Sequence, residues 1–277
     1  MRRFVDQVVL ITGAARGQGR SHAIRFASEG AHIIAIDVPP QVSSASVPMA
    51  LSQELEQTAA AVRAQDRRVV ARHADVRDLE QFAAVVADAV AELGRLDVVC
   101  ANAGRFTVGE LATMTDDTWD EVIAVNLSGV WRTIRATAAY LAEGAGGSIV
   151  IIGSTSSTRG ATKSGHYVAA KHGLVGLMKS AALELAEQGI RVNMVNPGYV
   201  DSPMIHNRMH YELLAPDLAP AERTRDRMRE RFARPNLLPV PWVQAEDVSN
   251  AVAWLASDEA RYVTGSSIAV DAGSLLT

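Results

Sequence analysis

Cysteine and lysine are scarce in this chain of 277 residues, which contains one cysteine and three lysines. With Cys100 alone, no disulfide can form within the chain and no cage of cysteines can hold a metal ion. Cys100 lies in an apolar run, so we expect a buried and unreactive thiol. The sequence predicts no metal site.

Long apolar runs and a strong net charge are also missing. No run approaches the ~20 residues that a membrane-spanning helix requires, and the first residues lack the apolar centre of a signal peptide. A net charge of −4 does not suit a protein that coats nucleic acid or an anionic membrane. We therefore expect a cytoplasmic protein whose partner is a small molecule.

Short apolar runs alternate with stretches of helical composition along the chain. The predicted strands are 8–11, 31–36, 68–73, 96–101, 147–153, 191–196 and 267–270, and helices are predicted at 20–28, 54–65, 79–93, 116–124, 128–142, 165–188 and 244–256. This order predicts an α/β fold of the doubly wound, Rossmann type, with a mostly parallel seven-stranded sheet and helices on both faces. No linker divides the chain, which favours a single domain over 1–277, although its length also admits two small domains.

A glycine-rich turn follows the first predicted strand. Gly13, Gly17 and Gly19 let the backbone approach a pyrophosphate, whose charge the N-terminus of the next helix attracts. Arg16 and Gln18 lie in the same turn. The first gap between glycines is one residue longer than in the common dinucleotide fingerprint. A glycine-rich turn of another doubly wound protein is the alternative interpretation.

The cofactor type depends on Asp37, which ends the second predicted strand and can bind the ribose hydroxyls of a dinucleotide. The 2′-phosphate of NADP would lie against this acid, and like charges ~4 Å apart cost about 1 kcal/mol in water and roughly 4 kcal/mol at a dielectric constant of 20. Arg16 instead favours NADP, because its guanidinium can pair with that phosphate. We give Asp37 the greater weight and predict NAD rather than NADP.

Three further segments bear on cofactor binding. The stretch 38–52 is longer than the usual βα connection, and it either covers the adenosine end of the cofactor or is a surface insertion. Asp75 and Val76 close the third strand, where they meet the adenine or, for Asp75, cap the strand end. Small residues that allow close approach follow the fourth strand, although a plain turn would look the same: Asn102, Ala103 and Gly104.

A hydroxyl, a phenol and an ammonium group are the candidate catalytic groups. Tyr167 and Lys171 are four residues apart and share one face of a predicted helix. A positive charge beside a phenol lowers its pKa from ~10, so Tyr167 becomes a usable acid or base. An ordinary amphipathic pair is the alternative. Ser154 lies upstream, while His166 is expected at the surface or in an interface.

These motifs occur together and in order, and the chain resembles the short-chain dehydrogenases/reductases over about residues 4–273. The resemblance rests on the glycine turn, Asn102-Ala103-Gly104, Asn126, Ser154, Tyr167-x-x-x-Lys171 and Pro197-Gly198. The turn 17–22 and the insertion 38–52 are similar to the mycofactocin-coupled, carveol-dehydrogenase-like subgroup.

The resemblance implies specific roles. Tyr167 is the general acid/base, Lys171 lowers its pKa and binds the nicotinamide ribose, and Ser154 binds the substrate oxygen. Asn126, expected at a break between two helices, holds a water of a proton relay. The carboxamide contacts are implied at Pro197, Gly198, Val200 and Ser202. A homotetramer and a possible external redox carrier are implied as partners.

The segment 203–241 is expected to form a substrate lid, with apolar residues that suit a small hydrophobic or cyclic alcohol. Six of its arginines, at 223, 225, 227, 229, 231 and 234, either form a solvated helix face with internal ion pairs or bind an acidic carrier protein. We predict NAD-linked interconversion of a secondary alcohol and a ketone. The alternatives are an NADPH-dependent 3-oxoacyl-(acyl-carrier-protein) reductase and a dinucleotide-sensing regulatory protein without turnover.

Overall fold

A computed structural model describes residues 2–38, 52–144 and 146–277. The predicted insertion 38–52 therefore falls almost entirely outside the described residues, and its role over the adenosine end stays a prediction. Within the described ranges, no helix has the length and apolar character needed to cross a membrane.

Over the described residues, the sheet contains seven strands in the order β3-β2-β1-β4-β5-β6-β7, and every neighbouring pair is parallel. The strands are β1 (Val8–Thr12), β2 (His32–Asp37), β3 (Val69–His73), β4 (Val98–Ala101), β5 (Gly147–Ile152), β6 (Ile190–Pro197) and β7 (Ser267–Val270). The strand order reverses between β1 and β4, where doubly wound folds bind ligands at the carboxyl ends of their strands. The predicted doubly wound fold is confirmed.

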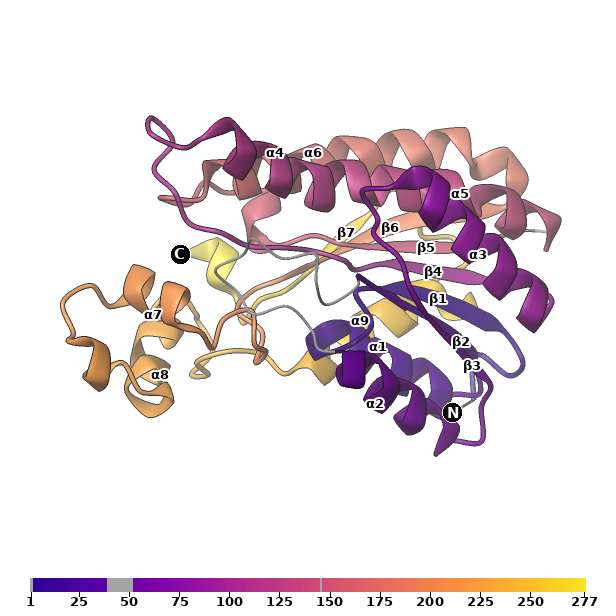
Figure 1. The fold of residues 1–277 in the computed structure, drawn as a ribbon, viewed down its shortest axis with the longest axis horizontal. Helices are drawn as coiled ribbons and strands as arrows, with labels where there is room; N and C mark the ends of the chain where they lie inside the picture. The colour runs from indigo at the N-terminus through magenta and orange to yellow at the C-terminus, as the bar shows by residue number, and fades with distance from the viewer. Residues whose placement is uncertain (1, 39–51, 145) are drawn as a thin grey trace.

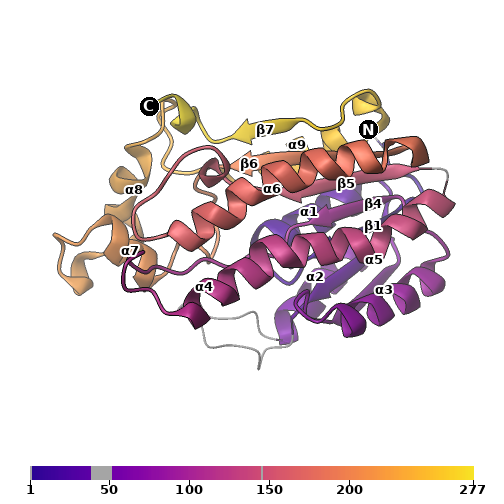
Figure 2. The same ribbon diagram turned by 90° about the horizontal axis from the view of Figure 1, so that it is seen from above.

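Helices cover both faces of the sheet (Figures 1 and 2). Figure 1 shows α3, α4, α5 and α6 above the sheet and α1, α2 and α9 below it. The helices are α1 (Gly17–Ser28), α2 (Ser52–Arg63), α3 (Leu79–Leu93), α4 (Asp116–Ile123), α5 (Gly129–Glu143), α6 (Gly165–Glu184), α7 (Arg208–Leu214), α8 (Arg225–Ala233) and α9 (Ala245–Ala256). Helices α7 and α8 lie beyond one end of the sheet, on the side where the C-terminus lies.

The central strands have no polar face, because helices cover the sheet on both sides. All five residues of β1 are buried. Val8 and Leu10 belong to the apolar cluster with α3, α5 and α6, while Val9 and Ile11 belong to the cluster with α1 and α9. This burial explains why the strands read as continuous apolar runs. Cys100 in β4 is also fully buried, and burial raises the pKa of its thiol, as expected for an unreactive cysteine.

The predicted helix break at Asn126 is wrong. Residues Ala124–Ser128 form a turn of π-helix that joins α4 to α5 without interruption. Such a turn places one extra residue in the helix, and π turns are frequent at functional sites. Asn126 consequently points into the protein and is fully buried.

The segment 203–241 contains α7 and α8 and has its own apolar cluster, apart from the two that flank the sheet. Met228, Phe232 and Trp242 are its large members, and each is buried. Five of the six arginines between residues 223 and 234 pair with carboxylates of residues 201–230. Arg229 instead lies over the ring of Trp242, 5.2 Å from its centroid. These contacts favour the solvated helix with internal ion pairs over a docking face for an acidic carrier protein.

Candidate active site

The turn between β1 and α1 cannot readily accept a side chain at its three glycine positions. Gly13 and Gly17 have φ angles of +68° and +54°, which L-residues with a side chain rarely adopt. At Gly19, a Cβ atom would lie 2.0 Å from the carbonyl oxygen of Gly13. The turn is held from β4, because the Asn102 side chain donates to the carbonyl oxygens of Thr12 and Gly13 at 2.9 and 3.1 Å.

Replacing Gly19 with Ala is expected to raise the dissociation constant for NAD about 100-fold, because Gly13 must move away and displacements of about 1 Å have effects of this size. Isothermal titration calorimetry measures the change. Gly176→Ala is the matched control, since a Cβ atom there meets nothing within 4 Å. Wild-type affinity in Gly19→Ala would show that the turn does not hold the cofactor.

The N-terminus of α1 is open to an anion. Arg16 occupies the N-cap position and makes no side-chain capping hydrogen bond, so the first amides of the helix have no capping side chain. The guanidinium of Arg16 lies 3.8 Å from the carboxylate of Glu54. That ion pair weakens the argument that Arg16 is present to bind a 2′-phosphate.

Asp37 is fixed by backbone amides at the end of β2. Its two carboxylate oxygens accept hydrogen bonds from the amides of Ala15 and Val38, each at 2.8 Å. Burial raises the pKa of Asp37, and the two amides oppose this effect. The carboxylate thus belongs to both the turn and the cavity beside it.

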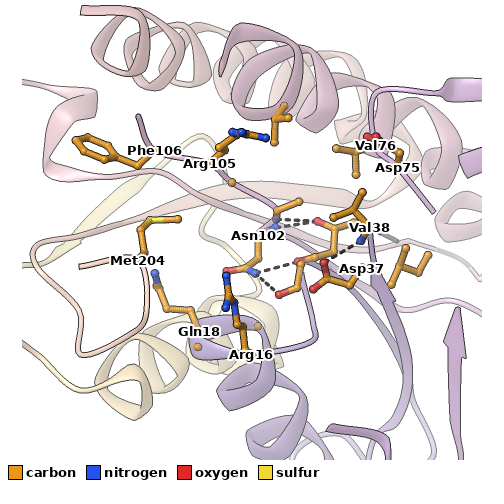
Figure 3. Close-up of a pocket in the computed structure, with 18 of the residues that line it drawn as sticks. Arg16, Gln18, Asp37, Val38, Asp75, Val76, Asn102, Arg105, Phe106 and Met204 are labelled. Atoms are coloured by element: carbon orange, nitrogen blue, oxygen red, sulfur yellow. Dashed lines mark hydrogen bonds between the residues drawn. The ribbon is translucent and has the colours of Figure 1, made fainter. Parts of the chain in front are cut away.

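A cavity of about 190 Å³ lies along this edge of the sheet (Figure 3). Its lining includes most of the predicted cofactor residues: Gly13, Arg16, Gly17, Gln18, Gly19, Asp37, Asp75, Val76, Asn102, Ala103, Gly104 and Ser202. Figure 3 shows Asp37 and Val38 on one side, Asp75 and Val76 above them, and Asn102 near the middle of the view. The cavity joins segments that are widely separated in the sequence.

Asp75 lines this cavity, but its carboxylate is paired with the guanidinium group of Arg77. Arg77 donates to it from the guanidinium at 2.6 Å and from the backbone amide at 2.8 Å. The side chain therefore forms a local turn just after β3. A carboxylate has about four acceptor sites, so it can still accept a hydrogen bond from an adenine, and the adenine contact at Asp75 stays a prediction.

A second cavity, of about 230 Å³, adjoins the first. Four residues line both cavities: Gln18, Phe106, Ser202 and Met204. Ser154 and Tyr167 line the second cavity only. Two ligands could therefore meet at the shared boundary, one from each side.

Tyr167 is fixed at the wall of the second cavity. It is 9% exposed, and its hydroxyl is hydrogen-bonded to the Ser154 side chain. The backbone amide of Ser154 is held by Ser157 Oγ at 3.1 Å and by Asn196 Oδ1 at 3.2 Å. Burial raises the pKa of Tyr167 to about 12, and the hydrogen bond from Ser154 opposes this effect.

Lys171 lies beside Tyr167 on α6, and the lowering of the Tyr167 pKa by its charge stays a prediction. Its Nζ lies 5.6 Å from the centre of the Tyr167 ring and donates to the carbonyl oxygen of Ile152 at 2.8 Å. Burial lowers the pKa of Lys171 to about 8. The two side chains share a face of α6 as predicted, but the ammonium group bonds to β5.

Asn126 uses its side chain to hold the backbone around residue 105. Its Oδ1 accepts from the amide of Arg105 at 2.9 Å, and its Nδ2 donates to the carbonyl oxygens of Arg105 and Val122 at 2.8 and 3.1 Å. A Cβ atom on Gly104 would lie 3.1 Å from Asn126 Oδ1 and 4.0 Å from Lys171 Nζ. Asn126 and Lys171 thus flank the same backbone segment.

Comparison with known proteins identifies the family. A family profile described as enoyl-(acyl carrier protein) reductase matches residues 13–274. The (−)-trans-carveol dehydrogenase of Rhodococcus erythropolis is 48% identical over 278 residues, which cover 100% of each chain. The chain belongs to the short-chain dehydrogenase/reductase family. The predicted family and its class, the oxidoreductases, are confirmed.

Two crystal structures of short-chain dehydrogenases/reductases are similar to this one. Carveol dehydrogenase from Mycobacterium avium in complex with NAD superimposes with a TM-score of 0.97 and 46% identity, covering 100% of both chains. A short-chain dehydrogenase from Mycobacterium paratuberculosis bound to NAD has a TM-score of 0.88 and 38% identity, covering 99% of this chain and 100% of that one. The carveol-dehydrogenase-like subgroup is confirmed, and the link to mycofactocin stays a prediction.

In this short-chain dehydrogenase/reductase, a further group of predicted cofactor residues lies at the end of β6 and just after it. Pro197, Gly198 and Val200 line the second cavity, and Ser202 lines both. A Cβ atom on Gly198 would lie 3.0 Å from the Cα atom of Asp271, so glycine is needed for the close approach of the chain after β7. The structure brings these residues to the boundary between the cavities.

Sequence reasoning missed two members of this site, Phe106 and His210. The ring of Phe106 contacts that of Tyr167 edge to face, with centroids 5.0 Å apart. The imidazole of His210 also lies against the ring of Phe106, with the two centroids 4.4 Å apart. A phenylalanine two residues after the Asn102–Gly104 run was the available signal for Phe106, and nothing in the local pattern singles out His210.

The expectation that His166 lies at the surface or in an interface is wrong. His166 is fully buried, and its Nε2 forms a 2.6 Å hydrogen bond with Thr107 Oγ1. This bond fastens the segment that carries Phe106 to the start of α6, where Tyr167 lies. His166 therefore has a structural role beside the site.

Proposed function

We propose that this chain is an NAD-dependent dehydrogenase that interconverts a secondary alcohol and a ketone. The observation that carries the proposal is the shared boundary of the two cavities, with the hydrogen-bonded Ser154 and Tyr167 on the substrate side. The NAD bound in two relatives supports the same cofactor here.

The residues of the first cavity fit NAD. The turn with Gly13 and Gly19 leaves room for a pyrophosphate, and the uncapped amides at the start of α1 favour its charge. Asp37 can accept from the ribose hydroxyls, and its charge disfavours a 2′-phosphate. When bound, NAD supplies the hydride acceptor and a positively charged nicotinamide ring, which no side chain can provide.

Proton transfer is assigned to the chain's own residues. Ser154 hydrogen-bonds the substrate oxygen, and Tyr167 takes the alcohol proton or returns it to the ketone. Lys171 binds the nicotinamide ribose and carries a positive charge near the phenol. Because the Asn126 amide is bonded to the backbone, we assign the relay water to its main-chain carbonyl in the π turn.

The substrate is a small hydrophobic or cyclic alcohol. Apolar side chains from the segment 203–241, which we propose as the substrate lid, line the second cavity: Met204, Ile205, Leu213 and Leu214. Two relatives are named carveol dehydrogenases, which supports a cyclic alcohol. The 3-oxoacyl reductase alternative is weaker, because Asp37 disfavours NADP and the lid arginines have partners.

A substrate panel tests the proposal. Purified protein is mixed with NAD and cyclic secondary alcohols, and reduced nicotinamide is followed by its absorbance. We expect reduction of NAD by secondary alcohols and none by the matched tertiary alcohols, which have no hydride to give. Because NAD could remain bound and require an external redox carrier, a single-turnover measurement accompanies the steady-state assay. Failure with every secondary alcohol in both assays would refute the proposed activity.

A cytoplasmic homotetramer is part of the proposal. Trp119 of α4 and Trp131 of α5 are 36% and 44% exposed, so these helices carry apolar surface that a partner subunit would cover. Sedimentation or light scattering measures the oligomeric state.

A further inference from the structure

One imidazole in the second cavity has no hydrogen-bonding partner. His210 of α7 is only 5% exposed, and it lines the cavity that holds Tyr167. Neither imidazole nitrogen bonds to an atom of the described residues; Nδ1 is closed off from the cavity, so Nε2 is the nitrogen that a ligand can reach. Buried polar atoms are nearly always bonded, so an exception needs an explanation.

The neighbouring histidine of the same segment shows the usual arrangement. His206 bonds Asp201 through Nε2 at 2.8 Å and Tyr211 through Nδ1 at 3.0 Å. Both of its nitrogens are therefore committed to the fold. His210 differs, since packing against Phe106 fixes its ring while its hydrogen-bonding capacity is unused.

Tyr167 and His210 both pack against Phe106, which forms part of an apolar wall of the second cavity. The Phe106 ring contacts both, with centroids 5.0 Å from Tyr167 and 4.4 Å from His210. Met204 and Leu213 pack in the same apolar cluster with Phe106 and Tyr167. A six-membered ring beside Phe106 would thus have a polar group near each end and apolar side chains along its length.

We propose that His210 selects substrates that carry a second oxygen across an apolar ring from the carbinol carbon. This inference rests on the proposed function, because it requires Tyr167 to face the carbinol oxygen. Burial lowers the pKa of His210 to about 4, so the imidazole is neutral near pH 7 and offers one donor and one acceptor. A hydroxyl or keto oxygen satisfies it, whereas a carboxylate gains no charged partner. The substrate class is a cyclic alcohol with a second hydroxyl or keto group, as in a 1,4-disubstituted ring.

Binding to the NAD-loaded protein tests this without turnover. The probes are cyclohexane-1,4-dione and 4-methylcyclohexanone, which differ in the second oxygen and which NAD cannot oxidise as ketones. We expect the dione to bind about tenfold more tightly. Its two equivalent carbonyl groups account for only about twofold of this difference. His210→Phe should remove this preference and His210→Gln should keep part of it. The exposed His172 provides the matched control, His172→Phe, which should keep it in full.

Two results would overturn the inference: equal affinity of the wild type for both probes, or an unchanged preference in His210→Phe. Nitrogen NMR of the wild type gives a reading that does not depend on a variant's folding, because the imidazole shifts of His210 should move with the dione and not with 4-methylcyclohexanone. If the protein oxidises no alcohol, the proposed function fails, while the binding ratio still reports on His210.

Discussion

Tyr167→Phe is expected to lower kcat for alcohol oxidation by about 10²–10⁴-fold, the range that general acid–base groups contribute. The phenol is the group that contacts Ser154, and removing its oxygen leaves no group at that point to take the proton. The ring and its edge-to-face contact with Phe106 remain. The dissociation constant for NAD should therefore stay close to that of the wild type.

The control and the pH dependence make this test specific. Tyr262→Phe removes the same atom from a side chain that is 90% exposed, and it should keep full activity. Because burial raises the pKa of Tyr167 to about 12, oxidation by the wild type should speed up as rising pH deprotonates the phenol, and ketone reduction should slow. Wild-type kcat in Tyr167→Phe would remove this residue from proton transfer.

Asp37→Asn is expected to reduce the preference for NAD over NADP by about fivefold to 10³-fold. This range corresponds to about 1 to 4 kcal/mol for like charges 4 Å apart, between water and a dielectric constant of 20. Asparagine keeps an oxygen that can accept from the amide of Ala15, so the turn should persist. The ratio of kcat/KM for the two cofactors measures the effect, and their dissociation constants serve if turnover is slow.

Asp75→Asn is the matched control for this ratio. It removes a carboxylate from the same cavity, but one that Arg77 already holds at 2.6 Å. We expect little change in the preference. If Asp37→Asn and Asp75→Asn had the same effect, the ribose hydroxyls could not be placed at Asp37.

The sheet was predictable because burial on both faces leaves a continuous apolar run for each strand. Helix α3 and strand β7 have the predicted bounds, and β1 extends by one residue to Thr12. The π turn at Asn126 was not predictable, because one extra residue in a helix leaves no signal in composition or periodicity. Its effect is large, because it buries the side-chain amide of Asn126 at the place where the sequence predicts a break between two helices.

Site residues with a fixed spacing were predictable, whereas those that depend on distant partners were not. Tyr167 and Lys171 share a helix, so four residues of separation place them together. His166 is buried because Thr107 lies against it, and Lys171 bonds to Ile152 of another strand. The partners of His166 and Lys171 come from tertiary packing, which a single sequence does not record.

The separate apolar cluster of the segment 203–241 bears on how such enzymes diversify. Met228, Phe232 and Trp242 stabilise this segment without using the two clusters that hold the sheet. Substitutions within this cluster therefore need not disturb the core that supports the glycine turn and Asp37. If this segment is the substrate lid, as we propose, selection can exchange one substrate for another through it while the core around the glycine turn is inherited unchanged.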